Sequence, residues 1–191
     1  MGVIAADSSL NFPDFRAAEK TFQLLTQVAG RAGRHHLPGE VFVQSYTPDH
    51  YSIIHASRHD YLSFVRDELK HRRTLGYPPY CRLILVTMTH ENLQVLVRMA
   101  ENFVSDLRGK AQQKGWFGGL DRFTSDAFDI LGPIASPIPR IKNRYRFQCM
   151  VKYRGAIDAV QLVRDVSNLT LEHLKDASLQ ISIDVDPQML M

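Results

Sequence analysis

Hydrophobic and polar positions repeat with two different periods along the chain, and these periods predict where strands and helices lie. Apolar runs and alternation at every second residue are typical of strands, whereas apolar spacings of three and four are typical of helices. In the first 76 residues the pattern predicts a strand, a helix rich in basic residues, a second strand and two more helices. The predicted strands are residues 2–6 and 40–46, and the predicted helices are residues 18–34, 47–54 and 60–73.

The pattern changes at Tyr77-Pro78-Pro79-Tyr80, which can continue neither a helix nor a central strand. We therefore expect two domains, residues 1–76 and residues 77–191. Beyond the prolines the order is strand, helix, strand, strand, helix, strand, which is the ferredoxin-like plan of an antiparallel sheet with two helices on one face. The predicted strands are residues 82–88, 127–131, 145–153 and 179–185, and the predicted helices are residues 92–110 and a segment that starts at Gly155.

The first helix concentrates polar groups on one face. Residues three, four and seven apart share a helix face, so Gln27, Arg31 and Arg34 line one side. Gly30 and Gly33 leave room for a close approach, and guanidinium groups suit phosphate. The alternative is a solvated basic face that ends at a glycine cap. The opposite, apolar side consists of Ala18, Phe22, Leu25, Val28, Ala29 and Ala32.

A second basic cluster lies in residues 140–154, which contain no acid. On a strand, Arg144, Arg146 and Gln148 share one face, and the aromatic and apolar residues between them share the other. The basic face suits the phosphates of a nucleic acid or the terminal carboxylate of a peptide, and the alternative is a solvated sheet face. We predict DNA binding by Arg146 and by the preceding Arg140 and Lys142, which lie on a loop stiffened by Pro133, Pro137 and Pro139.

Composition sets limits on these hypotheses. The chain has 191 residues and a net charge of +3, which is compatible with nucleic acid but weakly indicative by itself. No apolar run is long enough to span a bilayer, and no secretion signal is present, so we expect a cytoplasmic protein. Cys81 and Cys149 lack metal-ligand spacing and are expected to be buried thiols, without a metal site. No phosphate loop occurs, so an ATP-binding lobe would lie outside this chain.

The motif Q-x-x-G-R-x-G-R at residues 27–34 resembles motif six of superfamily-two helicases. The chain as a whole resembles the C-terminal part of the PriA family (primosomal protein N′) of bacterial replication-restart helicases. The matching stretches follow the order of the family and are residues 13–19, 27–34, 77–79, 131–133, 144–148 and 184–187.

This resemblance implies that residues 1–76 are the C-terminal portion of the second RecA-like motor lobe, with the Asp7–Ser9 loop near motif five. It implies that Arg31 and Arg34 are catalytic, and that Gln27, Gly30 and Gly33 complete the ATP-coupling motif. In residues 77–191, the resemblance assigns Arg144 and Gln148 to the acidic tail of single-stranded-DNA-binding protein.

The family unwinds DNA in the 3′→5′ direction with ATP and Mg²⁺, binds forked and single-stranded DNA, and assembles with other primosome proteins. The resemblance therefore implies a cytoplasmic, nucleoid-associated bacterial helicase, whose zinc is held by cysteines N-terminal to this segment. The isolated chain is expected to be inactive because it lacks the phosphate loop. Two alternatives are a stand-alone nucleic-acid-binding adaptor with a ferredoxin-like module and, less favoured, a small-molecule regulatory domain.

Overall fold

The fold is described here from a computed structural model, which covers residues 1–32, 39–118, 126–174 and 178–190. Contacts group the chain into two units, Met1–Leu75 and Gly76–Met191. The break falls beside the Tyr77-Pro78-Pro79-Tyr80 segment. Gly33 and Arg34 lie outside the described residues, so the predicted end of the first helix is untested there.

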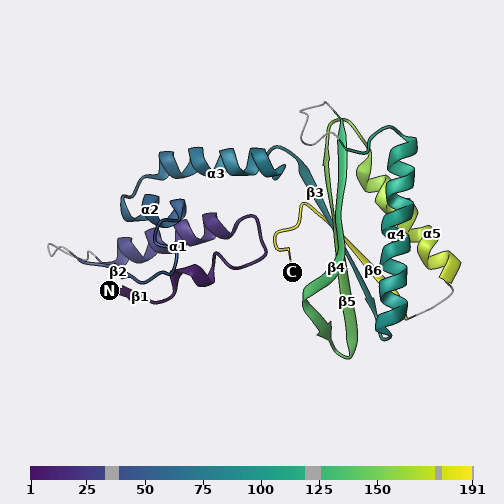
Figure 1. Cartoon of the computed structure of the whole chain (residues 1–191), viewed down its shortest axis with the longest axis horizontal. Coiled ribbons are helices and arrows are strands. Elements are labelled where there is room, and N and C mark those ends of the chain that lie inside the picture. The colour runs from purple at the N-terminus through teal and green to yellow at the C-terminus, as the bar shows by residue number, and fades with distance from the viewer. Residues whose placement is uncertain (33–38, 119–125, 175–177, 191) are drawn as a thin grey trace. The chain divides into compact units, whose positions relative to one another are not determined.

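The first unit is a short parallel β-α-β crossover followed by two helices (Figure 1). Its two strands pair over only two residues each, Gly2 with Phe42 and Val3 with Val43. The predicted strands are thus present but shorter than expected, because Ala5 takes a φ of 54° and the chain turns into a 3₁₀ helix. The elements are β1 (Gly2–Val3), η1 (Ala6–Ser8), α1 (Ala17–Ala32), β2 (Phe42–Val43), α2 (Tyr51–Ser57) and α3 (Tyr61–Leu75).

A small apolar core holds the three helices of the first unit together. Phe22 and Leu25 of α1 pack with Ile53 of α2 and Phe64 of α3, and all four side chains are buried. The rings of Phe22 and Phe64 stack with centroids 4.2 Å apart. The predicted apolar side of α1 is confirmed at its start, whereas Val28, Ala29 and Ala32 towards its end are half-buried.

Polar contacts complete the packing of the first unit. Arg72 of α3 lies between two carboxylates, 2.6 Å from Glu68 and 2.7 Å from Glu19 of α1. The hydroxyl of Tyr51 donates to Glu68 at 2.6 Å, so α1, α2 and α3 all join one network. Glu68 and Arg72 are four residues apart on α3, the spacing at which oppositely charged side chains meet on a helix.

The second unit is a four-stranded antiparallel sheet with the strand order β4-β5-β3-β6. This order and the alternation of strands and helices confirm the predicted split β-α-β plan. The elements are β3 (Arg82–His90), α4 (Leu93–Gln113), β4 (Ala127–Ile141), β5 (Arg144–Arg154), α5 (Ala159–Leu174) and β6 (Gln180–Val185).

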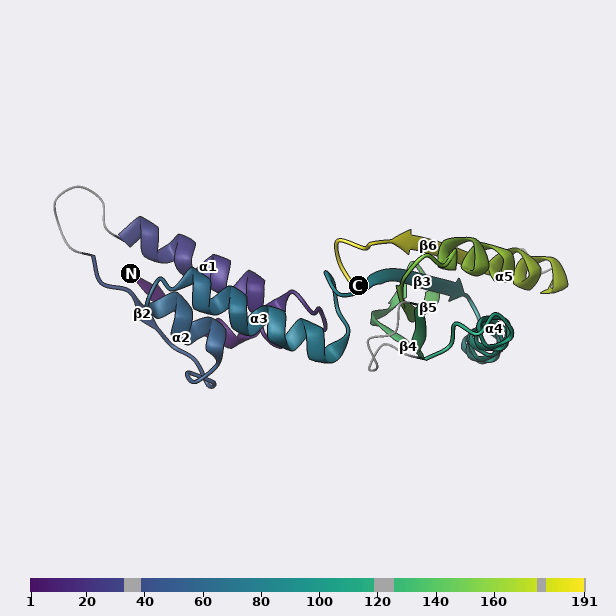
Figure 2. The same ribbon diagram turned by 90° about the horizontal axis from the view of Figure 1, so that it is seen from above.

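Both helices of this unit cover the same face of the sheet (Figures 1 and 2). Alternate side chains of β3, among them Ile84, Val86 and Met88, are fully buried against Phe103 of α4 and other residues of the helices. Cys149 lies in this core and Cys81 is buried elsewhere, as predicted. Burial raises the pKa of the Cys81 thiol to about 11 and that of Cys149 to about 12, so both are inert near neutral pH.

Two predictions for the second unit are wrong. The strand at residue 127 does not end at Gly132-Pro133: Gly132 takes a φ of +100°, and pairing with β5 resumes at Ile134. The proline-rich segment is therefore the outer part of an edge strand, where a missing N–H is tolerated, and not a loop. The last helix begins at Ala159 rather than at Gly155, whose φ of +94° is not helical.

Candidate functional site

The face of the sheet opposite the helices carries most of the polar groups of β3 and β5. The register pairs Thr89 with Arg146 and Thr87 with Gln148, and Lys152 opposite Leu83 lies further along the same face. Tyr145 and Phe147 point the other way and pack against the core. The predicted division of this strand into a basic face and an aromatic face is confirmed.

Arg144 is held at one end of this open face by neutral acceptors from two other elements. Its Nε donates to Thr89 Oγ1 at 3.2 Å, and its Nη2 donates to the backbone oxygens of Thr89, at 3.1 Å, and Ser178. Its Nη1 lies 3.5 Å from a carboxylate oxygen of Glu91. The side chain remains 21% exposed, so a fixed guanidinium faces solvent.

The acceptors around Arg144 are themselves fixed. The hydroxyl of Ser178 and the Nε2 of His90 form a hydrogen bond of 2.6 Å. The Nδ1 of His90 accepts from the backbone N–H of Asn92 at 2.9 Å, and Asn92 in turn caps α4. Sequence reasoning missed His90 and Ser178, because they lie far from Arg144 in the chain and belong to no motif.

Gln148 lies near the middle of the open face and is 7% exposed. Its Oε1 is buried and has no hydrogen-bond partner, and the same holds for Ser136 Oγ on β4 among the residues described. The backbone approaches closely here, since a Cβ at Gly132 would lie 2.9 Å from the carbonyl oxygen of Gln148. A buried oxygen without a hydrogen-bond partner is costly, so the Oε1 of Gln148 is a candidate for contact with a ligand.

Lys152 is the most buried base of the segment and was not among the predicted site residues. It is 6% exposed, and its Nζ lies 3.6 Å from the ring centroid of Tyr77. Burial lowers the pKa of this ammonium group. Lys152 therefore fixes the start of the second unit against the sheet rather than projecting into solvent.

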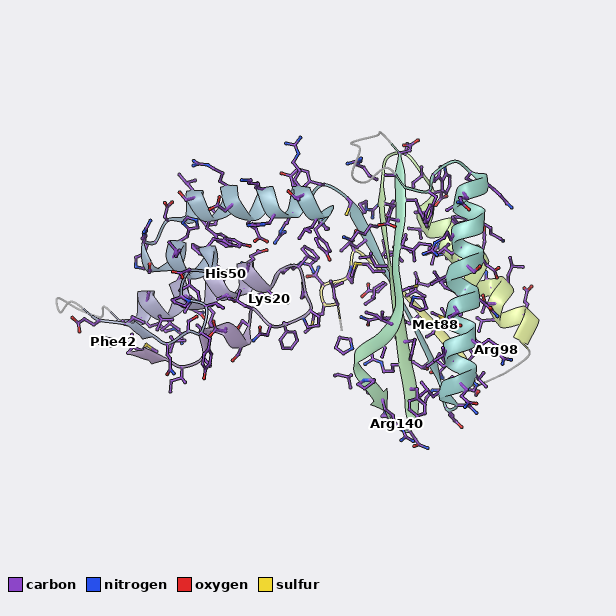
Figure 3. The ribbon with its side chains drawn as sticks, in the orientation of Figure 1. Lys20, Phe42, His50, Met88, Arg98 and Arg140 are labelled. Atoms are coloured by element: carbon purple, nitrogen blue, oxygen red, sulfur yellow. The ribbon has the colours of Figure 1, made fainter. Side chains whose placement is uncertain are left out.

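The three predicted DNA-binding bases do not share one face. Arg146 lies on the open face and donates to the carbonyl oxygen of Ile138 at 3.4 Å. Arg140 pairs with Tyr145 and lies over its ring, 4.8 Å from the centroid, on the other face. Lys142 is exposed in the two-residue turn between β4 and β5, beside Arg140, which Figure 3 labels at that end of the hairpin.

In the first unit, the predicted ATP-coupling residues lie at the end of α1. Gln27, Gly30 and Arg31 are all exposed. Gln27 also lines a groove of about 550 Å³ between α1 and α3, with Phe22 and Phe64 among its other lining residues. Gly33 and Arg34 fall outside the residues that the structure describes, so their predicted role stays a prediction.

Asp7, in the 3₁₀ helix η1, joins the segments that follow the two strands of the first unit. Its buried carboxylate accepts from the hydroxyls of Ser45, at 2.5 Å, and Thr47, at 2.6 Å, and from the backbone N–H groups of Tyr46 and Thr47. The hydrogen bond from Ser45, followed by those from Thr47 and Tyr46, holds the pKa of Asp7 well below its usual range. In this structure the Asp7 carboxylate therefore acts as a structural latch, meaning that it links η1 to residues 45–47. These partners lie about 40 residues away in the sequence, and no sequence motif predicted the contact.

The described residues contain neither a metal-binding cluster nor a membrane-spanning helix. Within residues 1–32, 39–118, 126–174 and 178–190, no group of three or more His, Cys, Asp and Glu side chains could hold a metal ion. In the same part of the chain, no helix is both long and apolar enough to cross a membrane.

Known proteins resemble this chain both over its second part and over its whole length. Residues 73–188 match the family model described as the primosomal protein N C-terminal domain. The chain is 45% identical over 191 residues to the replication restart protein PriA of Bacillus subtilis, covering all of this chain and 22% of that protein. It is 40% identical to PriA of Synechocystis, covering 98% of this chain and 20% of that protein, and 31% identical to PriA of Haemophilus influenzae, covering 98% and 24%. The chain thus spans about a fifth of the length of these relatives.

Proposed function

The chain belongs to the family of the primosomal protein N C-terminal domain, and we propose that it acts in bacterial replication restart as the C-terminal segment of an ATP-dependent 3′→5′ DNA helicase. In this proposal, the first unit supplies ATP-coupling arginines to a motor lobe. The second unit binds DNA and the acidic tail of single-stranded-DNA-binding protein, and it works in the cytoplasm with other primosome proteins.

The observation that carries the proposed partner site is the buried Oε1 of Gln148, which has no partner among the described residues and lies on the same sheet face as the fixed guanidinium of Arg144. A carboxylate accepts from a guanidinium through charge-assisted hydrogen bonds, and an extended peptide offers N–H and C=O groups to an amide. We propose that an acidic peptide tail places its free terminal carboxylate on Arg144 and its backbone near Gln148.

The partner site is tested with the 191-residue chain and a fluorescent acidic peptide that ends in Phe. Losing a charged hydrogen bond weakens binding, so Arg144→Ala should raise the Kd about tenfold to a hundredfold and Gln148→Ala by a smaller factor. Arg98→Ala is the control, since it removes the same charge from α4 on the covered side of the sheet, where Figure 3 labels Arg98. Binding like that of the wild type by both site variants would show that the assignment is wrong.

Single-stranded DNA is the second ligand in the same assay. Phosphate contacts are sequence-independent and weaken with salt. Arg146→Ala, which removes a base from the open face, should lower DNA affinity and reduce the salt slope by about one. An unchanged slope would remove Arg146 from the DNA site.

The architecture of the first unit supports the proposed motor lobe. Parallel sheets are normally covered on both faces and contain more than two strands. Here β1 and β2 pair over two residues, and Phe42 of β2 is 70% exposed. Such a pair is the expected edge of a larger parallel sheet built by other parts of a longer protein.

ATP and Mg²⁺ are proposed to be held by protein outside this chain, where the phosphate loop of the helicase would lie. The exposed Arg31 at the end of α1 fits the task of approaching a phosphate, because no acid is paired with it among the described residues. The zinc of the family is likewise proposed to be held outside this chain. In the full-length protein, Arg31→Ala should lower the rate of ATP hydrolysis about a thousandfold and spare DNA binding. Retained hydrolysis would count against this role.

A further inference from the structure

We infer that Glu91 is a built-in competitor for the acidic ligand of Arg144, and that it sets the affinity of this site for carboxylates. The inference rests on the partner site proposed above and adds to it a residue that tunes its selectivity. Among the described residues, Arg144 has three contacts with fixed acceptors and one with an exposed side chain that can move.

Three contacts orient the guanidinium and do not compete with a ligand. They come from Thr89 Oγ1 and from the backbone oxygens of Thr89 and Ser178, which belong to β3 and to the lead into β6. The bond between Ser178 and His90 keeps the second of these carbonyls in place. An incoming carboxylate therefore finds Arg144 already oriented.

The fourth contact is different in kind. Glu91 approaches Nη1 of Arg144 at 3.5 Å, and its side chain is 68% exposed, against 21% for Arg144. An exposed pair at this distance is weak and is readily exchanged for another carboxylate. Glu91 therefore occupies the position that a ligand carboxylate would take, and it has to be displaced or repelled when the ligand binds.

Among the residues that the structure describes, Glu91 makes no ion pair or side-chain hydrogen bond other than the one to Arg144. It lies between β3 and α4, but α4 is capped by Asn92, whose side chain accepts from the N–H groups of Gln94 and Val95. Glu91→Gln keeps the size of the side chain and leaves this cap intact. The variant therefore tests the effect of the negative charge of Glu91 separately from its size and from the cap of α4.

The test is a double-mutant cycle in the 191-residue chain with the acidic peptide ending in Phe. Glu91→Gln should lower the Kd about threefold to tenfold, because a competing pair is lost and a repulsion is relieved. Glu101→Gln, the same change on the exposed side of α4, is the matched control and should shift the Kd little.

The gain from Glu91→Gln should disappear in an Arg144→Gln background if Glu91 acts through Arg144. An equal gain in that background would reveal a general charge effect and would overturn the inference. If Arg144→Gln weakens binding but Glu91→Gln leaves the Kd unchanged, the role of Glu91 is wrong while the proposed partner site stands. If neither the wild type nor Glu91→Gln binds the peptide, the proposed partner site fails and the inference fails with it, whereas binding by Glu91→Gln alone would support both.

Discussion

The two units of this chain reach stability by different means. In the second unit, a four-stranded sheet and two helices enclose a core of twenty-one buried hydrophobic residues, whereas the corresponding cluster of the first unit contains six, counted over the residues described. The first unit compensates with buried polar networks around Asp7, Glu68 and Arg72. The second unit therefore depends mainly on apolar burial, whereas the first unit adds charged and polar contacts to a smaller apolar core.

The largest effect is expected from a substitution that creates a cavity in the core of the second unit. Phe103 is fully buried between α4 and the sheet, so Phe103→Ala should cost about 3–5 kcal/mol of unfolding free energy. Hydrogen exchange should show loss of protection in β3, β5 and α4 with little change in α1–α3. An equal loss in both units would break the comparison, because the units would then unfold as one.

The next test removes the central cation of the first unit. Arg72→Met keeps much of the apolar stem but leaves the buried Glu68 and its neighbour Glu19 without their cation. We expect a loss of about 2–3 kcal/mol in the first unit, measured by denaturant unfolding with exchange to locate the change. Arg73→Met, at an exposed position of the same helix, is the control.

Local sequence predicted some elements of the fold correctly and others not. The period of residues 144–151 correctly placed Arg144 and Gln148 on one face of β5, because alternation is a local property of a strand. The prolines at residues 133, 137 and 139 led to the wrong prediction of a loop in β4. An edge strand tolerates proline residues, which lack an N–H group, whereas a central strand does not.

The candidate site was predictable only in part, for a similar reason. The local sequence of β5 was enough to predict that Arg144 and Gln148 share one face of the sheet. The groups that orient Arg144 belong to β3 and the lead into β6, at separations of 55 and 34 residues. Such partners depend on strand order, which the pattern of one strand does not encode, and for that reason His90, Ser178 and Glu91 were missed.

The smallest expected effect concerns pH and Asp7. The Ser45 hydroxyl and the other donors hold the pKa of Asp7 below its usual range, so the folded state binds a proton less readily than the unfolded chain does. This contribution to stability is complete above the ordinary Asp pKa of about 4 and is lost as the pH falls below it. Asp7→Asn should therefore lower the Tm of the first unit at pH 7, and its difference from the wild type should narrow towards pH 3. A difference independent of pH would show that the charge of Asp7 is not what the latch requires.

The prolines of β4 have a consequence for how a partner can approach the second unit. An exposed sheet edge can pair with a foreign strand, but Pro133, Pro137 and Pro139 remove three backbone donors from the edge strand β4. The positive φ of Gly132 also interrupts its regular pairing. At the opposite rim, β6 carries the exposed Asp184. Addition of a foreign strand at either edge is therefore disfavoured, and the proposed ligands are expected to bind on the polar face of the sheet without promoting edge-to-edge aggregation.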